Sequence, residues 1–291
     1  MIKPTILHLI LKLMMKNLHQ RIGLFDSGVG GLTVLREMYR QMPTESLLYI
    51  ADSARLPYGT KTPAEILLYV REILDWMCGQ NVKMIIMACN TSSALALETV
   101  RHEYDIPILG VVLSGAKAAV DRGKRIGVIS TAATAKSHAY RQAIQEINPQ
   151  AQVWEMACPQ FVSLIEQNQL YTEETRQVAR EYLTPLIEQQ IDTLVYGCTH
   201  YRHLEQTIRA LLPASIRTID PAEYIVEAAD KELSLLGLRN HEFSLPTRFF
   251  VTGSPQQFAN LSQQWLGYYP LVQQIEVKQP VSELATLNLL E

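Results

Sequence analysis

The sequence predicts an α/β protein made of two pseudo-symmetric, doubly wound lobes with mainly parallel sheets. Segments typical of buried strands alternate with segments typical of helices over nearly the whole chain, and this alternation is characteristic of parallel sheets. The alternation divides into two series of about 100 residues each, a usual size for a domain. In each series a cysteine closes a strand, Cys89 in the first and Cys198 in the second, which predicts a site in the cleft between the lobes.

The predicted strands are short apolar segments. Residues 83–89 contain the clearest example, an apolar run of the kind that parallel sheets bury on both faces. In chain order, the sequence predicts strands at residues 21–26, 47–52, 83–89, 106–112, 123–130, 152–158, 192–198, 215–220, 247–252 and 273–277.

The predicted helices occupy the segments between these strands. A glycine-rich turn at residues 27–31 leads from the first strand into the first helix. Pro63 favours a helix start, because proline is well tolerated in the first helical turn. In chain order, the sequence predicts helices at residues 32–42, 63–78, 92–104, 138–147, 160–167, 173–190, 203–212 and 222–236, and a short helix after Pro255.

The order of these segments predicts the domain boundaries. The first lobe is expected to combine residues 21–113 with residues 221–291 and to carry Cys89, and the second lobe to cover residues 114–220 and to carry Cys198. Residues 1–20 are expected to be an extension outside the fold. Their apolar run is interrupted by charged residues and is shorter than the roughly 20 residues that span a bilayer, and no signal-peptide cleavage site follows.

The composition excludes several classes of protein. Apolar residues make up 47% and charged residues 19%, as in ordinary globular proteins, and the net charge of −3 provides no basic field for nucleic acid. The four cysteines form no C-x-x-C pair and no Cys/His spacing typical of zinc. A chain of this length does not need disulfides to fold, so we expect reduced thiols. From the cysteine spacing, the net charge and the short N-terminal apolar run, we expect no metal site, no nucleic-acid partner and no membrane span.

Residues 26–31 read Asp-Ser-Gly-Val-Gly-Gly at the end of the first predicted strand. The glycines permit a tight turn and a close approach of the backbone to a ligand, and the next helix could bind an anion at its N-terminus. The spacing is not G-x-G-x-x-G, and an ordinary strand–helix turn remains an alternative. Asp26 is a candidate functional residue, because a carboxylate at a strand end can orient or accept a proton.

Two further segments are weaker candidates when taken alone. Residues 56–60, Leu-Pro-Tyr-Gly-Thr, are expected to form an ordered loop over the crevice, although a simple turn explains them equally well. Thr131 and Thr134 close another strand, where they could bind an anionic group or only cap a helix.

The two cysteine tripeptides carry the strongest functional signal. Cys89-Asn90-Thr91 precedes a predicted helix, whose N-terminus would lower the pKa of the thiol. A single such cysteine could equally be a buried structural residue, since free cysteine is often buried. His200 lies two residues after Cys198 and can exchange a proton near neutral pH. The occurrence of two strand-terminal cysteines favours a pair of functional thiols.

From about residue 21 to its end, the chain resembles the bacterial glutamate racemases of the aspartate/glutamate racemase superfamily. The matching segments include DSGVGGLTVL, ADSARLPYG, ACNTSSA, ACPQFVSLIE and YGCTHY, in this order. The resemblance implies two α/β lobes with the active site between them. It also implies a cytoplasmic enzyme that forms a homodimer, interconverts L-glutamate and D-glutamate without a cofactor, and supplies D-glutamate for peptidoglycan.

The resemblance also implies roles for individual residues. Cys89 and Cys198 correspond to the two catalytic thiols, which act on the α-proton of D-glutamate and of L-glutamate respectively. Asp26 and His200 correspond to the groups that assist them, and Glu166 to a further acidic assistant. The residues that correspond to the substrate-binding shell are Ser27, Pro57, Tyr58, Gly59, Asn90, Thr91, Thr131, Thr134 and Thr199.

Some positions depart from the pattern of the family. Ser114 stands where proline is frequent, Tyr196 where a leucine or a small residue is usual, and Arg202-His203 where Pro-Leu is frequent. None of these replaces a catalytic group, so we expect them to affect local loop shape rather than the reaction.

The residue types suit an inversion at Cα. One thiolate removes a proton from one face and one thiol delivers a proton to the other, and cysteine suits both tasks because its pKa lies near ambient pH. Hydrogen bonds to the α-carboxylate would stabilise the carbanion. The alternatives are a racemase of aspartate or another acidic amino acid, and a non-catalytic carboxylate-binding regulator of the same fold. A redox dithiol is disfavoured by the lack of C-x-x-C.

Overall fold

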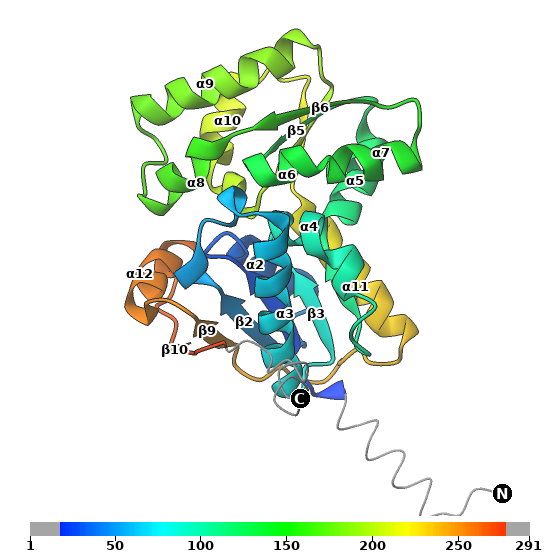
Figure 1. The fold of residues 1–291 in the computed structure, drawn as a ribbon, viewed down its shortest axis with the longest axis vertical. Coiled ribbons are helices and arrows are strands. Elements are labelled where there is room, and N and C mark those ends of the chain that lie inside the picture. The colour runs from blue at the N-terminus through cyan, green and yellow to red at the C-terminus, as the bar shows by residue number, and fades with distance from the viewer. Residues whose placement is uncertain (1–17, 278–291) are drawn as a thin grey trace, which may run out of the picture.

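The computed structural model of the protein describes residues 18–277 and consists of two parallel sheets with interleaved helices. In Figure 1 the four-stranded sheet and its helices lie above the six-stranded sheet and its helices. This arrangement confirms the predicted fold class. Most of the predicted N-terminal extension, residues 1–17, lies outside the described residues.

The larger sheet has the strand order β10-β9-β2-β1-β3-β4, and all its pairs are parallel. Its central strand β1 is buried along its whole length, as the apolar sequence predicts. The last two strands of the described chain, β9 and β10, join this sheet beside β2. The strands of the sheet are β1 (Ile22–Asp26), β2 (Leu47–Ala51), β3 (Met84–Met87), β4 (Ile108–Gly110), β9 (Arg248–Val251) and β10 (Val272–Gln274).

The smaller sheet has the strand order β6-β5-β7-β8 and is also parallel throughout. Its strands are β5 (Arg125–Ser130), β6 (Gln152–Ala157), β7 (Thr193–Gly197) and β8 (Arg217–Ile219). Because the strands in each sheet run in one direction, their carboxyl ends lie along one edge of that sheet. The functional residues predicted at strand ends are therefore gathered at these two edges.

Helices connect the strands. The α-helices of the first part of the chain are α2 (Leu32–Gln41), α3 (Pro63–Gly79), α4 (Asn90–Val100), α5 (Val111–Arg122), α6 (Ala132–Ser137) and α7 (Ala139–Ile147). Those of the second part are α8 (Pro159–Glu166), α9 (Glu173–Glu188), α10 (Glu205–Leu211), α11 (Pro221–Leu235) and α12 (Pro255–Leu266). Three short 3₁₀ helices are η1 (Ser53–Arg55), η2 (Tyr58–Thr60) and η3 (Thr199–Leu204).

Apolar clusters cover both faces of each sheet. Within β1, Leu24 packs into one cluster and Phe25 into the cluster on the opposite face, because side chains alternate along a strand. The same alternation separates Val128 from Ile129 on β5. Trp265 of α12 packs against one cluster of the larger sheet and also against one of the smaller sheet, so its indole contacts both halves of the fold.

Many predicted boundaries are shifted by one residue or more in the structure, as three examples illustrate. The strand predicted at residues 106–112 ends at Gly110, and the helix α5, which we did not predict, begins at Val111. The apolar run continues through this boundary because the first turn of α5 is buried, so periodicity gives no signal there. The helix predicted from residue 92 begins at Asn90, and the helix predicted from residue 203 is preceded by η3.

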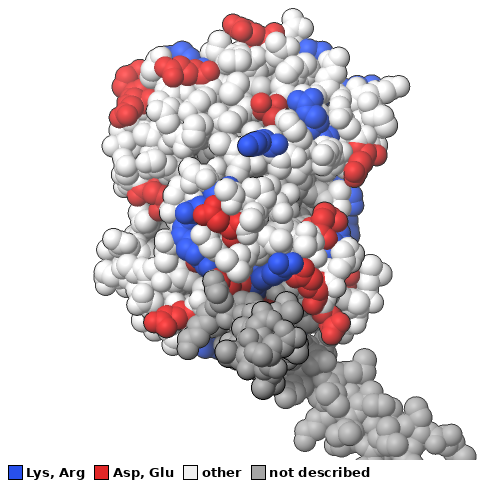
Figure 2. All heavy atoms as spheres, in the orientation of Figure 1, with Lys and Arg blue, Asp and Glu red and all other residues white. Residues whose placement is uncertain are grey.

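The other predicted strands and helices are present in the structure, which also contains the short helix α6 that we did not predict. The division into two lobes stays a prediction: the boundary at residues 113/114 falls inside helix α5, and the boundary at 220/221 falls at the start of helix α11, which packs against α5. No helix of the described chain is long and apolar enough to cross a membrane. On the face shown in Figure 2, acidic and basic side chains are interspersed.

Candidate active site

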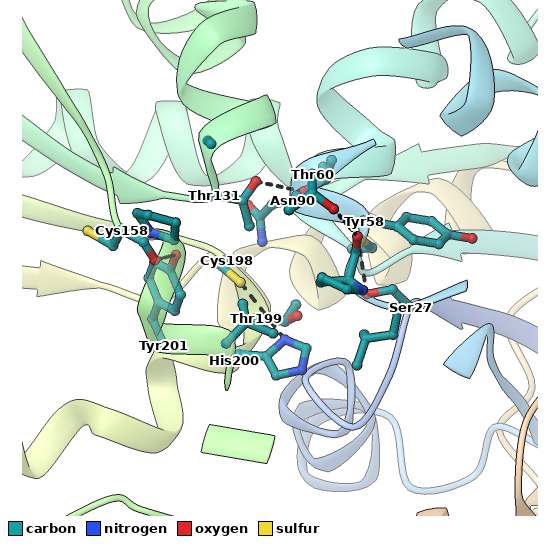
Figure 3. Close-up of a pocket in the computed structure, with 18 of the residues that line it drawn as sticks. Ser27, Tyr58, Thr60, Asn90, Thr131, Cys158, Cys198, Thr199, His200 and Tyr201 are labelled. Carbon is teal, nitrogen blue, oxygen red and sulfur yellow. Dashed lines mark hydrogen bonds between the residues drawn. The ribbon is translucent and has the colours of Figure 1, made fainter. Parts of the chain in front are cut away.

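The carboxyl ends of strands from both sheets meet at a cavity of about 260 Å³. Cys89 follows β3 of the larger sheet and Cys198 follows β7 of the smaller sheet, and both line this cavity. Figure 3 shows Cys198 with its sulfur directed toward His200. A cavity of this size accommodates a small metabolite. The lining residues are Ser27, Leu56, Pro57, Tyr58, Gly59, Thr60, Cys89, Asn90, Thr91, Thr131, Ala132, Cys158, Pro159, Val162, Ser163, Glu166, Cys198, Thr199, His200 and Tyr201.

Cys89 is the N-cap residue of α4 and is 5% exposed. Its Sγ lies 3.9 Å from Ser27 Oγ, and the hydroxyl of Ser92 in the first turn donates to the Cys89 carbonyl over 3.0 Å. Burial, and next the negative charge of Asp26, raise the pKa of the Cys89 thiol to about 12. The thiol of Cys89 is therefore protonated at neutral pH when the cavity is empty, and the lowered pKa predicted from the helix N-terminus is wrong because burial outweighs that effect.

Cys198 begins a chain of polar contacts along the wall of the cavity. Its Sγ lies 3.9 Å from His200 Nδ1, and His200 Nε2 lies 2.8 Å from Glu166 Oε1. Burial acts to lower the pKa of His200, but the hydrogen bonds and charges of Cys198 and Glu166 outweigh it and raise this pKa well above its usual value. A protonated His200 favours negative charge on the Cys198 sulfur.

Asp26 ends β1 behind Cys89 and is fully buried. Its Oδ1 accepts from the Gly28 N–H over 2.9 Å, and its Oδ2 accepts from the Thr199 hydroxyl over 3.1 Å. Burial raises the pKa of Asp26, although the positive charge of His200 and these two hydrogen bonds partly oppose the shift. Asp26 therefore lies between the two cysteine tripeptides and contacts one of them directly.

Three threonine hydroxyls form a triangle at one wall of the cavity. Thr91 Oγ1 lies 2.9 Å from Thr131 Oγ1 and 3.1 Å from Thr134 Oγ1, and the last two are 3.0 Å apart. Thr91 belongs to α4 and the other two to the start of α6, so the triangle joins the two sheets. Thr131 also caps α6 by accepting from the Thr134 N–H, as the capping alternative predicts.

Asn90 presents donors to the cavity. The Tyr140 hydroxyl donates to Asn90 Oδ1 over 2.6 Å, which assigns the oxygen to the protein side and leaves the amide NH₂ for a ligand. Asn90 also begins α4, a helix of 11 residues whose first two residues, Asn90 and Thr91, line the cavity. The amide and the helix N-terminus together suit a carboxylate.

The comparisons with known proteins agree with this geometry. The sequence profile of the Asp/Glu/Hydantoin racemase family matches residues 22–229, which is more than two thirds of the chain. The chain belongs to this racemase family. Its similar relatives include the glutamate racemase of Gloeothece citriformis, 63% identical over 270 residues that cover 93% of this chain and 97% of that protein. The glutamate racemase of Rippkaea orientalis is 65% identical over 261 residues, covering 90% and 93%.

Solved racemase structures share the fold. Glutamate racemase isoform RacE1 from Bacillus anthracis has a TM-score of 0.86 at 36% identity, covering 89% of this chain and 98% of that chain. The glutamate racemase of Francisella tularensis, solved in complex with D-glutamate, has a TM-score of 0.85 at 32% identity, covering 90% and 100%. The protein is therefore an enzyme of the racemase family, as the sequence motifs predict.

Most of the predicted site residues of this racemase line the cavity. Asp26 and Thr134 are the exceptions, since each lies behind the wall and contacts a lining residue. The roles of all the predicted site residues in the reaction stay predictions. The predicted residues that line the cavity are Ser27, Pro57, Tyr58, Gly59, Cys89, Asn90, Thr91, Thr131, Glu166, Cys198, Thr199 and His200.

Sequence reasoning missed part of the wall. Cys158 follows β6 just as the two predicted thiols follow their strands, and this position was a usable signal. The apolar residues gave no signal, because a lining residue and a core residue look alike in a sequence. The missed lining residues are Leu56, Thr60, Ala132, Cys158, Pro159, Val162, Ser163 and Tyr201.

Apart from His200, the donors that line the cavity of the racemase are neutral. Its lining residues include no Lys or Arg within the described chain, so hydroxyls, amides and N–H groups are the donors available to an anionic ligand. No group of three His, Cys, Asp or Glu side chains in residues 18–277 could hold a metal ion.

The positions that depart from the family pattern lie outside the cavity. His203 stacks on Trp265 with 3.6 Å between ring centroids, and Arg202 Nε lies 3.5 Å from Asp220 Oδ2. Burial, and next the charge of His200, lower the pKa of His203 to about 3, so this ring is neutral. Ser114 and Tyr196 are buried in α5 and β7.

Proposed function

We propose that the protein racemises glutamate, interconverting the L- and D-enantiomers by a two-thiol reaction without a cofactor. The observation that carries the proposal is the position of Cys89 and Cys198, which come from different sheets and line one cavity. The high identity to curated glutamate racemases supports the choice of substrate.

In the proposed reaction, the Cys198 thiolate removes the α-proton of L-glutamate while the Cys89 thiol delivers a proton to the opposite face of Cα. The roles reverse for D-glutamate. The raised pKa of Cys89 supports this assignment because it favours a proton on Cys89 in the empty enzyme, and His200, with its raised pKa, lies 3.9 Å from the Cys198 sulfur. The resting enzyme is then ready for L-glutamate.

Supporting groups act on each thiol in this scheme. His200 stabilises charge on Cys198 and is itself oriented by Glu166. Asp26 assists Cys89, since a buried carboxyl with a raised pKa can exchange a proton with a neighbouring group. The Asn90 amide and the N-terminus of α4 stabilise the carboxylate while negative charge develops at Cα.

The biological setting follows from the family. We infer that the enzyme supplies D-glutamate for peptidoglycan in the cytoplasm, and the finding that all four cysteines are free supports a reducing compartment. We also expect a homodimer, which light scattering on the purified protein would test. The proposed lobes are residues 21–113 with 221–291 and residues 114–220.

Circular dichroism of each glutamate enantiomer incubated with the protein tests the proposal. With no added cofactor, the circular dichroism signal of L-glutamate and of D-glutamate should decay to zero. Cys89→Ser and Cys198→Ser should each lower the rate by about 10³-fold, within the range for loss of a general acid or base. Decay of the aspartate signals alone would identify an aspartate racemase, and D-glutamate binding with no decay would identify a non-catalytic carboxylate-binding protein.

A further inference from the structure

The loop at residues 56–60 contributes five lining residues to the cavity but has little regular structure of its own. It is the last part of segment 52–60, which follows β2 and contains the 3₁₀ helices η1 and η2, each only three residues long. Few backbone hydrogen bonds hold it, among them those from Arg55 N to Asp52 O and from Lys61 N to Tyr58 O. The position of the loop must therefore depend on side chains.

Asp52, at the start of the loop, is a fully buried carboxylate with three side-chain donors. The Tyr58 hydroxyl and Arg55 Nε donate to its Oδ2, the latter over 2.6 Å. The Thr252 hydroxyl, just after β9, donates to its Oδ1 over 2.7 Å. The backbone N–H of Asp52 donates to the carbonyl of Asp26 over 2.9 Å, and this bond links Asp52 to the end of β1.

Arg55 bridges two buried carboxylates. Its guanidinium pairs with Asp52 and with Glu72 of α3, and it lies over the Tyr69 ring at 4.2 Å from the centroid. Glu72 is 5% exposed, so Arg55 balances negative charge that water does not reach. The contacts of Arg55 fix the loop to α3.

The side chain of Tyr58 faces away from the cavity. Figure 3 shows its ring directed away from Cys198, and its hydroxyl is engaged by Asp52. The ring packs edge-on against Phe25, with 6.2 Å between centroids. The Tyr58 hydroxyl is therefore engaged by Asp52 and is not available to exchange a proton with a ligand.

The loop also meets the other half of the fold. A Cβ atom at Gly59 would lie 2.6 Å from Thr131 Cβ, so the backbone of the loop touches the threonine triangle. A shift of the loop would change the width of the cavity between η2 and α6.

We propose that Asp52, Arg55 and the Tyr58 hydroxyl form an anchor that positions the loop at residues 57–60 against Thr131 and thereby sets substrate affinity rather than proton transfer. These are positioning residues, since they act through the loop backbone. The proposal rests on the proposed racemisation of glutamate and adds a determinant of binding to it.

Tyr58→Phe tests the anchor, because it removes one hydrogen bond and keeps the packed ring. We expect KM to rise about tenfold for both enantiomers and kcat to stay within about twofold, the pattern for loss of equal ground-state and transition-state binding. Asp52→Asn should raise KM similarly, and the double variant should add little to it because the residues act as one unit.

Tyr104→Phe is the matched control. The Tyr104 hydroxyl donates to Asp75 Oδ1 over 2.7 Å, and the residue does not line the cavity. The control should lose some thermal stability with an unchanged KM. A Tyr58→Phe variant with a lowered Tm and a wild-type KM would show that the contact is only structural and would overturn the proposal.

Amide hydrogen exchange over residues 56–61 gives a readout that does not depend on activity. Exchange should be faster in Tyr58→Phe than in the wild type and in Tyr104→Phe, and equal exchange would contradict the anchor even in an inactive protein. A wild type that leaves both glutamate enantiomers unchanged would instead contradict the proposed function alone.

Discussion

Thr199 donates a hydrogen bond to Asp26 over 3.1 Å, and this contact joins the two sheets at the cavity. Asp26 ends β1 of the larger sheet, and Thr199 follows Cys198 at the end of β7. Asp26, the predicted assistant of Cys89, is therefore hydrogen-bonded to a residue of the Cys198 tripeptide. This contact is buried and joins the sheets, so a small change in the separation of the sheets would alter the surroundings of both the Cys89 and the Cys198 sulfur.

Gly30 makes this close approach possible. A Cβ atom at Gly30 would clash with Thr199 Oγ1 and would lie 2.5 Å from His200 Nδ1. We expect Gly30→Ala to displace both side chains and to lower kcat by about 10²-fold, as misplacement of a catalytic group by about 1 Å does. Gly79→Ala is the control, since a Cβ there meets nothing within 4 Å. Equal activity of the two variants in the racemisation assay would show that the approach is not critical.

His200→Asn should affect the two directions differently. Loss of the imidazolium destabilises negative charge on Cys198, which removes the proton from L-glutamate in the proposed reaction. The equilibrium constant of a racemisation is one, so kcat/KM must remain equal in both directions and the asymmetry should appear in kcat. We expect kcat from L to D to fall about tenfold more than kcat from D to L.

His138→Asn provides the matched control for that variant. His138 Nδ1 lies 2.8 Å from Glu155 Oε2, a comparable histidine–glutamate pair outside the cavity, and asparagine tolerates the positive φ of 55° at this position. The control should keep wild-type kcat in both directions. Equal losses of kcat from L and from D in His200→Asn would refute a directional role.

The two thiols should differ in their reaction with iodoacetamide. Cys89 and Cys198 are 5% and 6% exposed, so access alone does not separate them. Burial and the charge of Asp26 raise the pKa of Cys89 to about 12, whereas the raised pKa of His200 places a cation beside Cys198. Peptide mass spectrometry should find Cys198 alkylated first at pH 7, with the rate at Cys89 still rising above pH 9. Faster alkylation of Cys89 at pH 7 would contradict this assignment.

Asp220 should make stability depend on pH. It caps α11, and burial raises its pKa to about 6 despite the hydrogen bond from the Ala222 N–H. Because the folded state holds this proton more tightly than the unfolded state, its stabilising effect is present below about pH 4 and is lost as pH rises through about 6. Asp220→Asn keeps the cap without the titration.

Denaturant unfolding at several pH values measures this effect. A shift of about two units corresponds to about 3 kcal/mol, so the stability of Asp220→Asn relative to the wild type should increase by up to that amount between pH 4 and pH 7. A difference that stays constant over this range would mean that Asp220 has an ordinary pKa in the folded protein.

The sequence predicts most of the fold because buried parallel strands are short apolar runs with polar or glycine-rich ends. The segment at residues 83–89 illustrates this, since it contains β3 and ends at Cys89. The start of α5 at Val111 was not predictable in this way, because strand and helix are both buried there and share one apolar run.

The site was predictable where function leaves a polar residue at a strand end, as at Asp26 and Cys198. It was not predictable where position depends on contacts distant in sequence. The resemblance implies that Tyr58 belongs to the substrate-binding shell, and only the fold shows that its hydroxyl contacts Asp52. The stack of His203 on Trp265 likewise joins residues far apart in the chain.

Deuterium exchange at Cα tests the two-thiol proposal most directly. In D₂O, Cys198→Ala should still exchange the α-proton of D-glutamate without inverting it, because Cys89 alone can remove a proton and return a deuteron to the same face. Cys89→Ala should exchange only L-glutamate. NMR and chiral chromatography would report exchange and inversion separately. If either variant still interconverts the enantiomers at an appreciable rate, or exchanges the opposite enantiomer, the assignment of the two cysteines is wrong.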